Sequence, residues 1–197
     1  MTTDRAWLFP VLRAIPAAVV ALVITFSADH SAILGFLALG SFALATGATV
    51  AVAALRGAYA RGPFLLQGSL LAIGGVFALA SARDELPALL ALTSVIIGAS
   101  GIIELVSGLR ARGRLAAARD WVFVGAISAL FAVLVLLIPA DFSHAISIPG
   151  KVVPSLTASV ILVGALGAYA AIVAVYLVIA GLSLKWAPSA STTASEA

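Results

Sequence analysis

The sequence predicts an all-α membrane protein of six transmembrane helices, and two observations lead to this prediction. First, 63% of the 197 residues are hydrophobic and only 10% are charged, whereas a soluble domain keeps about a quarter of its residues charged. Second, the apolar residues form long runs, comparable to the ~20 residues that a helix needs to cross a bilayer. A transmembrane barrel would instead alternate apolar and polar residues over segments of about ten, so helices are favoured.

The six predicted spans follow from the apolar runs and from the polar residues that interrupt them. They cover residues 10–27, 31–55, 63–82, 86–109, 121–138 and 155–184. The first run also has the basic lead-in of a signal peptide, but cleavage after Ala28 would place the bulky Phe26 where a small residue is required. We therefore predict that the first run is a span, which the turn Asp29-His30 joins to the second.

Charged residues and prolines set the limits of the next spans. Arg56 ends the second span, and Pro63 begins the third at the first helical turn, where proline costs least. The segment Arg83-Asp84-Glu85 separates the third span from the fourth. Arginines fill the connection between the fourth span and the fifth, which ends before Pro139.

The last part of the chain has the least regular pattern. Residues 140–154 form a longer connection that contains Pro149-Gly150, and we expect it to be partly re-entrant or to lie at the membrane interface. The sixth span is longer than a bilayer requires, so we expect it to tilt or project. Small polar residues at 187–197 predict a disordered cytoplasmic tail after a bundle of residues 1–186.

The distribution of basic residues predicts the orientation of the chain. Six spans place both termini on one side, and nine of the eleven Lys and Arg residues fall on that side. Because short cytoplasmic loops carry the excess of basic residues, both termini are predicted to be cytoplasmic. The nine are Arg5, Arg13, Arg56, Arg61, Arg110, Arg112, Arg114, Arg119 and Lys185, and the other two are Arg83 and Lys151.

The spans pair into three hairpins whose second helices resemble one another. Each second helix has a small residue followed by glycine near its cytoplasmic end, at Thr46-Gly47, Ser107-Gly108 and Ala180-Gly181. Units that cannot bury themselves alone pack about a shared axis, which predicts a pseudo-threefold bundle of parallel repeats. Small residues four apart, Ala43 with Gly47 and Gly164 with Ala168, predict close helix packing. Glycines that line a conduction path are the alternative.

This combination of features resembles a known family. Six spans in three hairpins, the motif G-x-x-G-I-I-E-L from Gly98, the run W-V-F-V-G-A-I-S-A-L-F-A-V-L-V-L-L-I-P at 121–139 and the glycine-spaced second helices are similar to the HdeD-like acid-resistance membrane proteins. The resemblance extends from about residue 10 to residue 184. It implies a multi-pass protein of the bacterial cytoplasmic (inner) membrane, linked in some members to acid or stress tolerance. It implies no catalytic residue, and the longer connection 140–154 departs from the family's compact hairpins.

Glu104 is the candidate site residue inside a span, and it has two interpretations. It precedes Arg110 by six residues, about 9 Å along a helix axis, so it can snorkel toward the cytoplasmic interface or pair with an arginine. Alternatively, it is a protonatable group in the bundle that serves a proton path, an ion site or acid sensing. Burial alone would favour its neutral form.

Two further groups of candidate residues lie between the spans. The outer connections form a candidate pH-responsive rim, because protonation of histidines beside carboxylates makes this face more positive in acid; solvated turn residues are the simpler interpretation. The loop after the fourth span is expected to set topology and to contact anionic lipid, with a partner protein or a phosphoinositide-like headgroup as alternatives. The rim comprises Asp29, His30, Asp84, Glu85, Asp141 and His144, and the basic loop comprises Arg110, Arg112, Arg114 and Arg119.

The sequence favours a non-enzymatic membrane protein. Cysteine is absent, which excludes thiolate ligands and cysteine nucleophiles, and no metal-binding or phosphate-binding motif is present. We therefore predict no catalytic residue, metal or cofactor. An intramembrane enzyme would need polar residues converging from several spans, and the sequence offers almost none. The alternative function is a small oligomeric transporter or a proton-coupled channel that uses Glu104. The expected partners are the lipid bilayer and a second copy or another membrane protein, with no nucleic acid.

Overall fold

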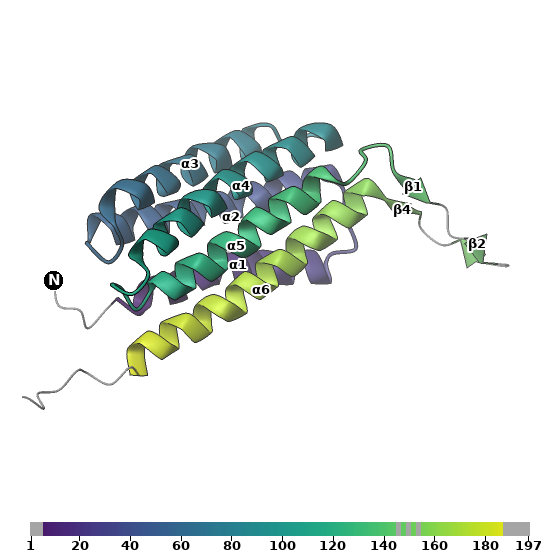
Figure 1. Cartoon of the computed structure of the whole chain (residues 1–197). Helices are drawn as coiled ribbons and strands as arrows, with labels where there is room; N and C mark the ends of the chain where they lie inside the picture. The colour runs from purple at the N-terminus through teal and green to yellow at the C-terminus, as the bar shows by residue number, and fades with distance from the viewer. Residues whose placement is uncertain (1–5, 145–146, 149–150, 153–154, 187–197) are drawn as a thin grey trace, which may run out of the picture.

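The structure, a computed structural model, describes residues 6–144, 147–148, 151–152 and 155–186. Six of its helices are long and apolar enough to cross a membrane. This confirms the predicted fold class and makes the chain an integral multi-pass membrane protein. The helices are α1 (Leu8–Phe26), α2 (Ala32–Leu55), α3 (Arg61–Ala80), α4 (Leu86–Ala111), α5 (Ala118–Leu136) and α6 (Ala158–Trp186) (Figure 1).

The helix boundaries lie within a few residues of most predicted span limits, and capping interactions and proline set where individual helices begin. α3 begins at Arg61, so that Pro63 is its third residue. Proline is tolerated there because the first four N–H groups of a helix have no partner within the helix. The turn before α2 is fixed by Asp29, whose carboxylate accepts from the backbone N–H of Ser31 at 2.8 Å, while Ser31 caps the helix by accepting from Leu34 N–H. The predicted tail, 187–197, lies outside the described residues.

The connection between α5 and α6 forms short strands. β1 (Ser143–His144) pairs antiparallel with β4 (Leu156–Thr157), and β2 (Ser147–Ile148) pairs with β3 (Lys151–Val152). The paired strands extend away from the end of the helices (Figure 1), so in the described part of this segment the chain does not re-enter the bundle. The first residues of the predicted sixth span are therefore extended, and α6 begins at Ala158.

The six helices form a closed ring with an inner and an outer set. The inner helices α2, α4 and α6 contact one another, and their apolar segments are more buried than those of the outer helices α1, α3 and α5. The most extensive contacts join α2 to α3, α4 to α5 and α6 to α1. The tightest pairs therefore lie between the predicted hairpins rather than within them. The threefold repeat itself stays a prediction.

Glycines allow these three pairs to approach closely. A Cβ built on Gly47 of α2 would lie 2.7 Å from the carbonyl oxygen of Gly68 in α3. One built on Gly125 of α5 would lie 2.7 Å from the carbonyl oxygen of Gly101 in α4, and one on Gly181 of α6 would lie 3.0 Å from the carbonyl oxygen of Trp7. Backbones that close leave no room for a larger residue, which is how small residues associate helices in lipid.

One of the two predicted small-residue pairs is wrong. Gly47 makes a close contact as expected, but a Cβ on Gly164 would meet no atom within 4 Å. The close contact on α6 is made three residues later by Gly167, where a Cβ would lie 2.8 Å from Ile24 Cγ2. The four-residue spacing identified the correct helix but the wrong face, because α6 carries several small residues on different faces.

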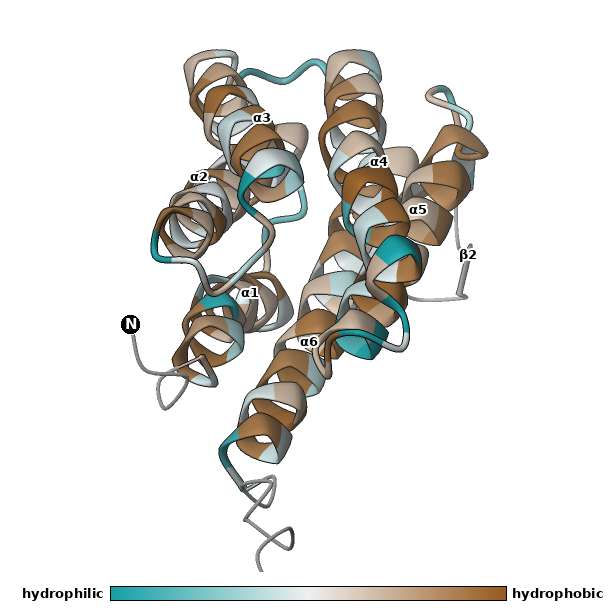
Figure 2. Cartoon of the chain, turned by 60° about the vertical axis from the view of Figure 1, so that its left-hand side comes forward, coloured by the Kyte–Doolittle hydropathy of each residue, from teal (hydrophilic) through white to brown (hydrophobic). Residues whose placement is uncertain are grey.

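The start of α1 and the end of α6 lie at the same end of the bundle. Lys185 Nζ, near the end of α6, lies 4.7 Å from the ring centroid of Trp7, just before α1. Hydrophobic residues make up most of the length of the helices, and the most hydrophilic residues gather at helix ends and connections (Figure 2). Which side of the membrane this end faces is set by the positive-inside prediction alone.

Candidate functional site

Glu104 lies in the interior of the bundle and forms an ion pair with Arg13 of α1. Arg13 Nη1 donates to Glu104 Oε1 at 2.7 Å, and Nη2 donates to Oε2 at 2.9 Å. This bidentate geometry is the strongest form of a guanidinium–carboxylate contact. The two side chains are only 5% and 2% exposed. Glu104 is thus paired with an arginine, but the arginine comes from the first helix and not from the loop that follows α4.

Arg13 has a different place from the one that the basic-residue count assumed. It lies within α1 and its side chain faces the bundle, so it is not a residue of a cytoplasmic lead-in. Without Arg13, the side of the membrane that holds both termini still has eight of the eleven basic residues. The predicted orientation is therefore unchanged. Of these eight, Arg5 lies outside the described residues.

Gln67 of α3 is hydrogen-bonded to this pair as well. Its Nε2 donates to Glu104 Oε2 at 2.9 Å and to Ser100 Oγ at 3.0 Å. Ser100 and Glu104 lie one turn apart on α4 and therefore share a face, so one amide group can reach both. Gln67 is fully buried. Through it, the ion pair ties α1, α3 and α4 together.

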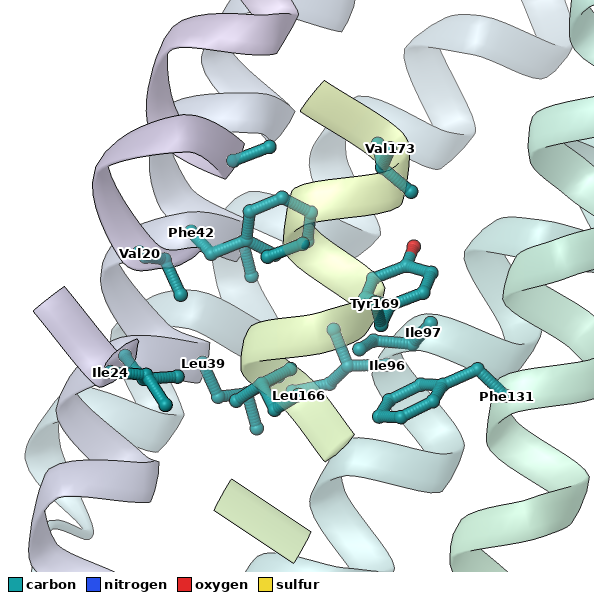
Figure 3. Packing of buried hydrophobic residues seen from close by; sticks show 14 of the residues in the cluster. Val20, Ile24, Leu39, Phe42, Ile96, Ile97, Phe131, Leu166, Tyr169 and Val173 are labelled. Atoms are coloured by element: carbon teal, nitrogen blue, oxygen red, sulfur yellow. The ribbon is translucent and has the colours of Figure 1, made fainter. Parts of the chain in front are cut away.

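Polar residues from the other three helices complete the site. Ser128 of α5 is hydrogen-bonded to the hydroxyl of Tyr169 in α6 at 2.8 Å, and Thr46 of α2 is buried beside them. Figure 3 shows Tyr169 near Phe131 and Phe42, which pack on its ring face and edge. Each of the six helices thus supplies a buried polar side chain. We call this set the polar centre: Arg13, Thr46, Gln67, Ser100, Glu104, Ser128 and Tyr169.

Two small cavities flank the ion pair. One is lined by Thr46, Ser128 and Tyr169, and the other by Tyr59 and Asp120, with Arg13 and Glu104 lining both. Each offers about 10 Å³ for the centre of a water molecule, which is roughly the space that one water requires. Among the described residues, Arg13 Nε, Thr46 Oγ1 and Gln67 Oε1 are buried without a hydrogen-bond partner, so the centre has polar capacity that its own side chains do not use.

An aromatic cluster closes the end of the bundle beside the second cavity. Tyr59, in the connection between α2 and α3, packs against Phe64 with ring centroids 4.8 Å apart, against Trp121 at 5.6 Å and against Phe9 at 6.2 Å. Burial raises the pKa of the Tyr59 phenol, and the positive charge of Arg13 partly opposes this rise. Tyr59 therefore stays neutral at physiological pH, and the cluster separates the ion pair from solvent.

The six residues of the predicted rim occupy three separate connections. Asp29 serves the cap of α2, and Glu85 Oε1 lies 3.8 Å from Arg83 Nη1 in an exposed ion pair. Asp84, Asp141 and His144 are exposed, and His30 is half-buried. In the described part of the chain, no hydrogen bond or ion pair links one of these connections to another, and no three His, Asp or Glu residues group as metal ligands would. The structure therefore does not bring the rim together.

The basic loop is exposed and lies at the end of the bundle that holds the termini. Arg110, Arg112, Arg114 and Arg119 all face outward. The Arg114 guanidinium donates to the backbone carbonyl of Arg110, which satisfies one of the free carbonyls at the end of α4. The loop is separated from Glu104 by the last two turns of α4, so it takes no part in the polar centre.

Of the seven residues of the polar centre, sequence reasoning identified only Glu104 as a site residue, and among the six that it missed Arg13 and Gln67 left the clearest signal. Arg13 has apolar residues on both sides, Trp7 to Leu12 before it and Ala14 onward after it. Such a position lies inside a span rather than before it. Gln67 is a lone amide in an apolar run, and a polar group in a span needs a partner. The expectation that few polar residues converge from several spans is wrong, because six helices contribute.

Chemically, the polar centre presents a guanidinium paired with a carboxyl group, together with neutral hydroxyl and amide groups. The carboxylate can accept protons or hydrogen bonds, and the guanidinium can only donate.

Comparisons of the chain with protein-family models, with curated proteins and with solved structures found no match.

Proposed function

We propose that this chain is a non-enzymatic protein of the bacterial cytoplasmic membrane, of the HdeD-like type, that acts in acid or envelope stress tolerance. In this proposal the polar centre holds six helices in one arrangement and does not carry a solute. The observation behind it is the compensated Arg13–Glu104 pair, which lies between cavities with space for about one water each. The stress role rests on the family resemblance.

The energetics of buried charge support a structural role for the pair. An isolated charge inside a membrane costs several kcal/mol, and removing one partner of a buried ion pair typically costs about 3–5 kcal/mol. Arg13, Gln67 and Glu104 come from three different helices, so only one arrangement of these helices satisfies all of them. The centre therefore specifies how the helices pack, at a small net gain in stability.

The shape of the interior also supports this proposal. Beyond Tyr169, toward the end opposite the termini, the core consists of apolar side chains such as Leu39, Ile96 and Leu166 (Figure 3). No polar group of the described core continues the path in that direction except Thr93 and Ser94, which bond to carbonyls of their own helix. A solute would have to displace this packing in order to cross.

Flux measurements in proteoliposomes test the proposal. With the external pH stepped from neutral to acidic, we expect the wild-type protein to leave proton and ion permeability at the level of protein-free liposomes. A protein-dependent flux would overturn the structural role. Acid survival of a bacterial host that expresses the chain tests the stress role separately, and unchanged survival would remove that part of the proposal.

A proton-coupled channel is the second candidate, and the two cavities favour it. They place polar space on both sides of Glu104, and the second reaches Asp120, which is half-buried near the terminal end and accepts from the Tyr176 hydroxyl at 2.9 Å. If a flux is present, it should be lost in Glu104→Gln and changed in Glu104→Asp, which keeps the charge opposite Arg13. A flux that neither variant alters would place the path elsewhere.

A further inference from the structure

A groove opens between α3 and α4 at the end of the bundle that holds both termini. Its volume is about 700 Å³, which lies within the range of small-molecule binding sites. The shaft of the groove is apolar and accessible: Leu66 is 60% exposed, Ile102 is 56% exposed and Val106 is 37% exposed. It lies on the side of the bundle, where the neighbours of a spanning helix are lipid or another membrane protein.

The groove lies next to the part of α3 and α4 where the two helices are in contact. Near mid-membrane they touch, since a Cβ on Gly74 would lie 2.8 Å from Ile96 Cγ1, and Gln67 bridges them through Ser100. Past Gln67, Pro63 and Leu66 line the groove on α3, and Ile103 and Val106 line it on α4.

The length of the groove matches one leaflet of a bilayer. Its wall on α4 runs from Ile102 to Arg110, which is about 12 Å at a rise of 1.5 Å per residue. A hydrocarbon core of ~30 Å gives each leaflet about 15 Å. An acyl chain from one leaflet therefore fits the groove, whereas a spanning helix of a second protein would need a surface that crosses the whole bilayer.

The charge of the groove is confined to its mouth. Arg110 and Arg114 line it there, both exposed, and the hydrogen bond from Arg114 to the Arg110 carbonyl keeps Arg114 beside the end of α4. No carboxylate lines the groove. An apolar shaft one leaflet long with two guanidinium groups at its mouth is complementary to a lipid with an anionic head, because guanidinium pairs well with phosphate.

We propose that the α3–α4 groove binds one anionic phospholipid from the leaflet next to the termini. One acyl chain lies along Leu66, Ile102 and Val106, and the phosphate contacts Arg110 and Arg114. The site is independent of whether the polar centre conducts. It also adjoins that centre, because Leu66 precedes Gln67 and Ile103, on the groove wall, precedes Glu104. A bound lipid therefore supports the two helices where the Gln67–Glu104 hydrogen bond joins them.

Lipid retention tests this site. The full chain is reconstituted in vesicles of equal phosphatidylglycerol and phosphatidylcholine, extracted in mild detergent and analysed by native mass spectrometry. We expect about one retained phosphatidylglycerol per chain. In the double variant Arg110→Gln/Arg114→Gln, the preference for phosphatidylglycerol should fall about 25-fold, because each arginine near an anionic headgroup contributes a factor of about five. The matched control Arg112→Gln/Arg119→Gln removes two charges from the same loop without changing the groove. The preference for phosphatidylglycerol should change little in this control.

A second variant separates the acyl chain from the headgroup. Val106→Trp fills the shaft while leaving both arginines, and we expect it to abolish retention, whereas Val95→Trp, at an exposed position of α4 outside the groove, should retain the lipid. An equal loss of phosphatidylglycerol preference in the two arginine double variants would overturn the proposal, because it would show that the general positive charge of the loop, and not the groove, attracts the lipid. Retention that survives Val106→Trp would overturn the acyl-chain site, and a dimer that dissociates in Val106→Trp would identify a second copy as the occupant.

Discussion

Arg13 and Glu104, 91 positions apart in the chain, meet through two parallel hydrogen bonds in the interior of the bundle. The pair joins an outer helix to an inner one across the ring, and Gln67 adds a third helix. Because both charges are buried, the stability of the whole bundle depends on keeping them together.

Removal of the Glu104 charge is expected to destabilise the protein. Glu104→Gln leaves the Arg13 guanidinium buried without a counter-ion, and we expect a loss of about 3–5 kcal/mol, seen as a lower thermal unfolding midpoint in detergent. The control is Glu85→Gln, which removes one partner of the exposed Arg83–Glu85 pair and should cost at most about 1 kcal/mol. Equal effects of the two substitutions would show that the buried pair does not stabilise the bundle.

The glycine contact between α4 and α5 should tolerate no added methyl group. In Gly125→Ala, the Cβ would lie 2.7 Å from the carbonyl oxygen of Gly101, so the helices must separate, at a cost of about 1–3 kcal/mol. Gly164→Ala is the control, since nothing lies within 4 Å of its Cβ. There, the higher helix propensity of alanine should be neutral or stabilising by up to about 1 kcal/mol. Thermal unfolding of both variants tests this, and an intact Gly125→Ala protein would argue against the close packing.

The buried phenol of Tyr59 predicts a loss of stability in alkali. Its pKa is raised in the folded protein, so below pH ~10 the side chain is neutral in both states and contributes no pH dependence. As the pH rises above that value, the unfolded chain ionises first and unfolding is favoured. We expect the unfolding midpoint of the wild type to fall more steeply above pH ~10 than that of Tyr59→Phe. Parallel curves for the two proteins would show that Tyr59 is accessible to solvent.

Cysteine labelling can test the predicted orientation, because the chain has no cysteine of its own. Ala116 and Ala140 are exposed residues just before and just after α5. If the termini are cytoplasmic, a membrane-impermeant maleimide should label Ala140→Cys in intact cells, and Ala116→Cys only after permeabilisation. Neither change alters a charge, so the basic residues that set the topology are preserved. The reverse labelling pattern would invert the assignment.

Much of the fold could be predicted from the sequence, because each span is long and strongly apolar. Pro63, Arg56 and the glycines marked where helices begin, end or pack. The choice of neighbours could not be predicted in the same way. The sequence grouped consecutive spans into hairpins but did not indicate which helices pack most closely, and the contacts of Gly47 and Gly125 join consecutive hairpins. Many glycines offered alternative faces, and only the complete ring decides among them.

The site was predicted in part. Glu104 stood out because a carboxylate in an apolar run is costly, but its partner could not be read from local spacing. Arg110, six residues further along α4, was much closer in sequence than Arg13 was. Tertiary structure brings Arg13 to the carboxylate, and the same is true of Gln67 and Tyr169. Residues that come together from six helices appear in the sequence only as single polar residues within apolar runs.

The sequence distance between Arg13 and Glu104 has a consequence for how the protein is made. The first helix leaves the ribosome well before its counter-ion exists, and at about 5–20 residues per second the delay amounts to roughly 5–20 seconds. During that time Arg13 is expected to remain near the headgroups, where its long side chain can reach water. α1 can take its final depth only once α4 has been synthesised, and α6, which packs against α1, closes the ring last. A nascent chain arrested before residue 104 should therefore hold α1 closer to the membrane surface, and residue-specific crosslinking to lipid can measure that depth.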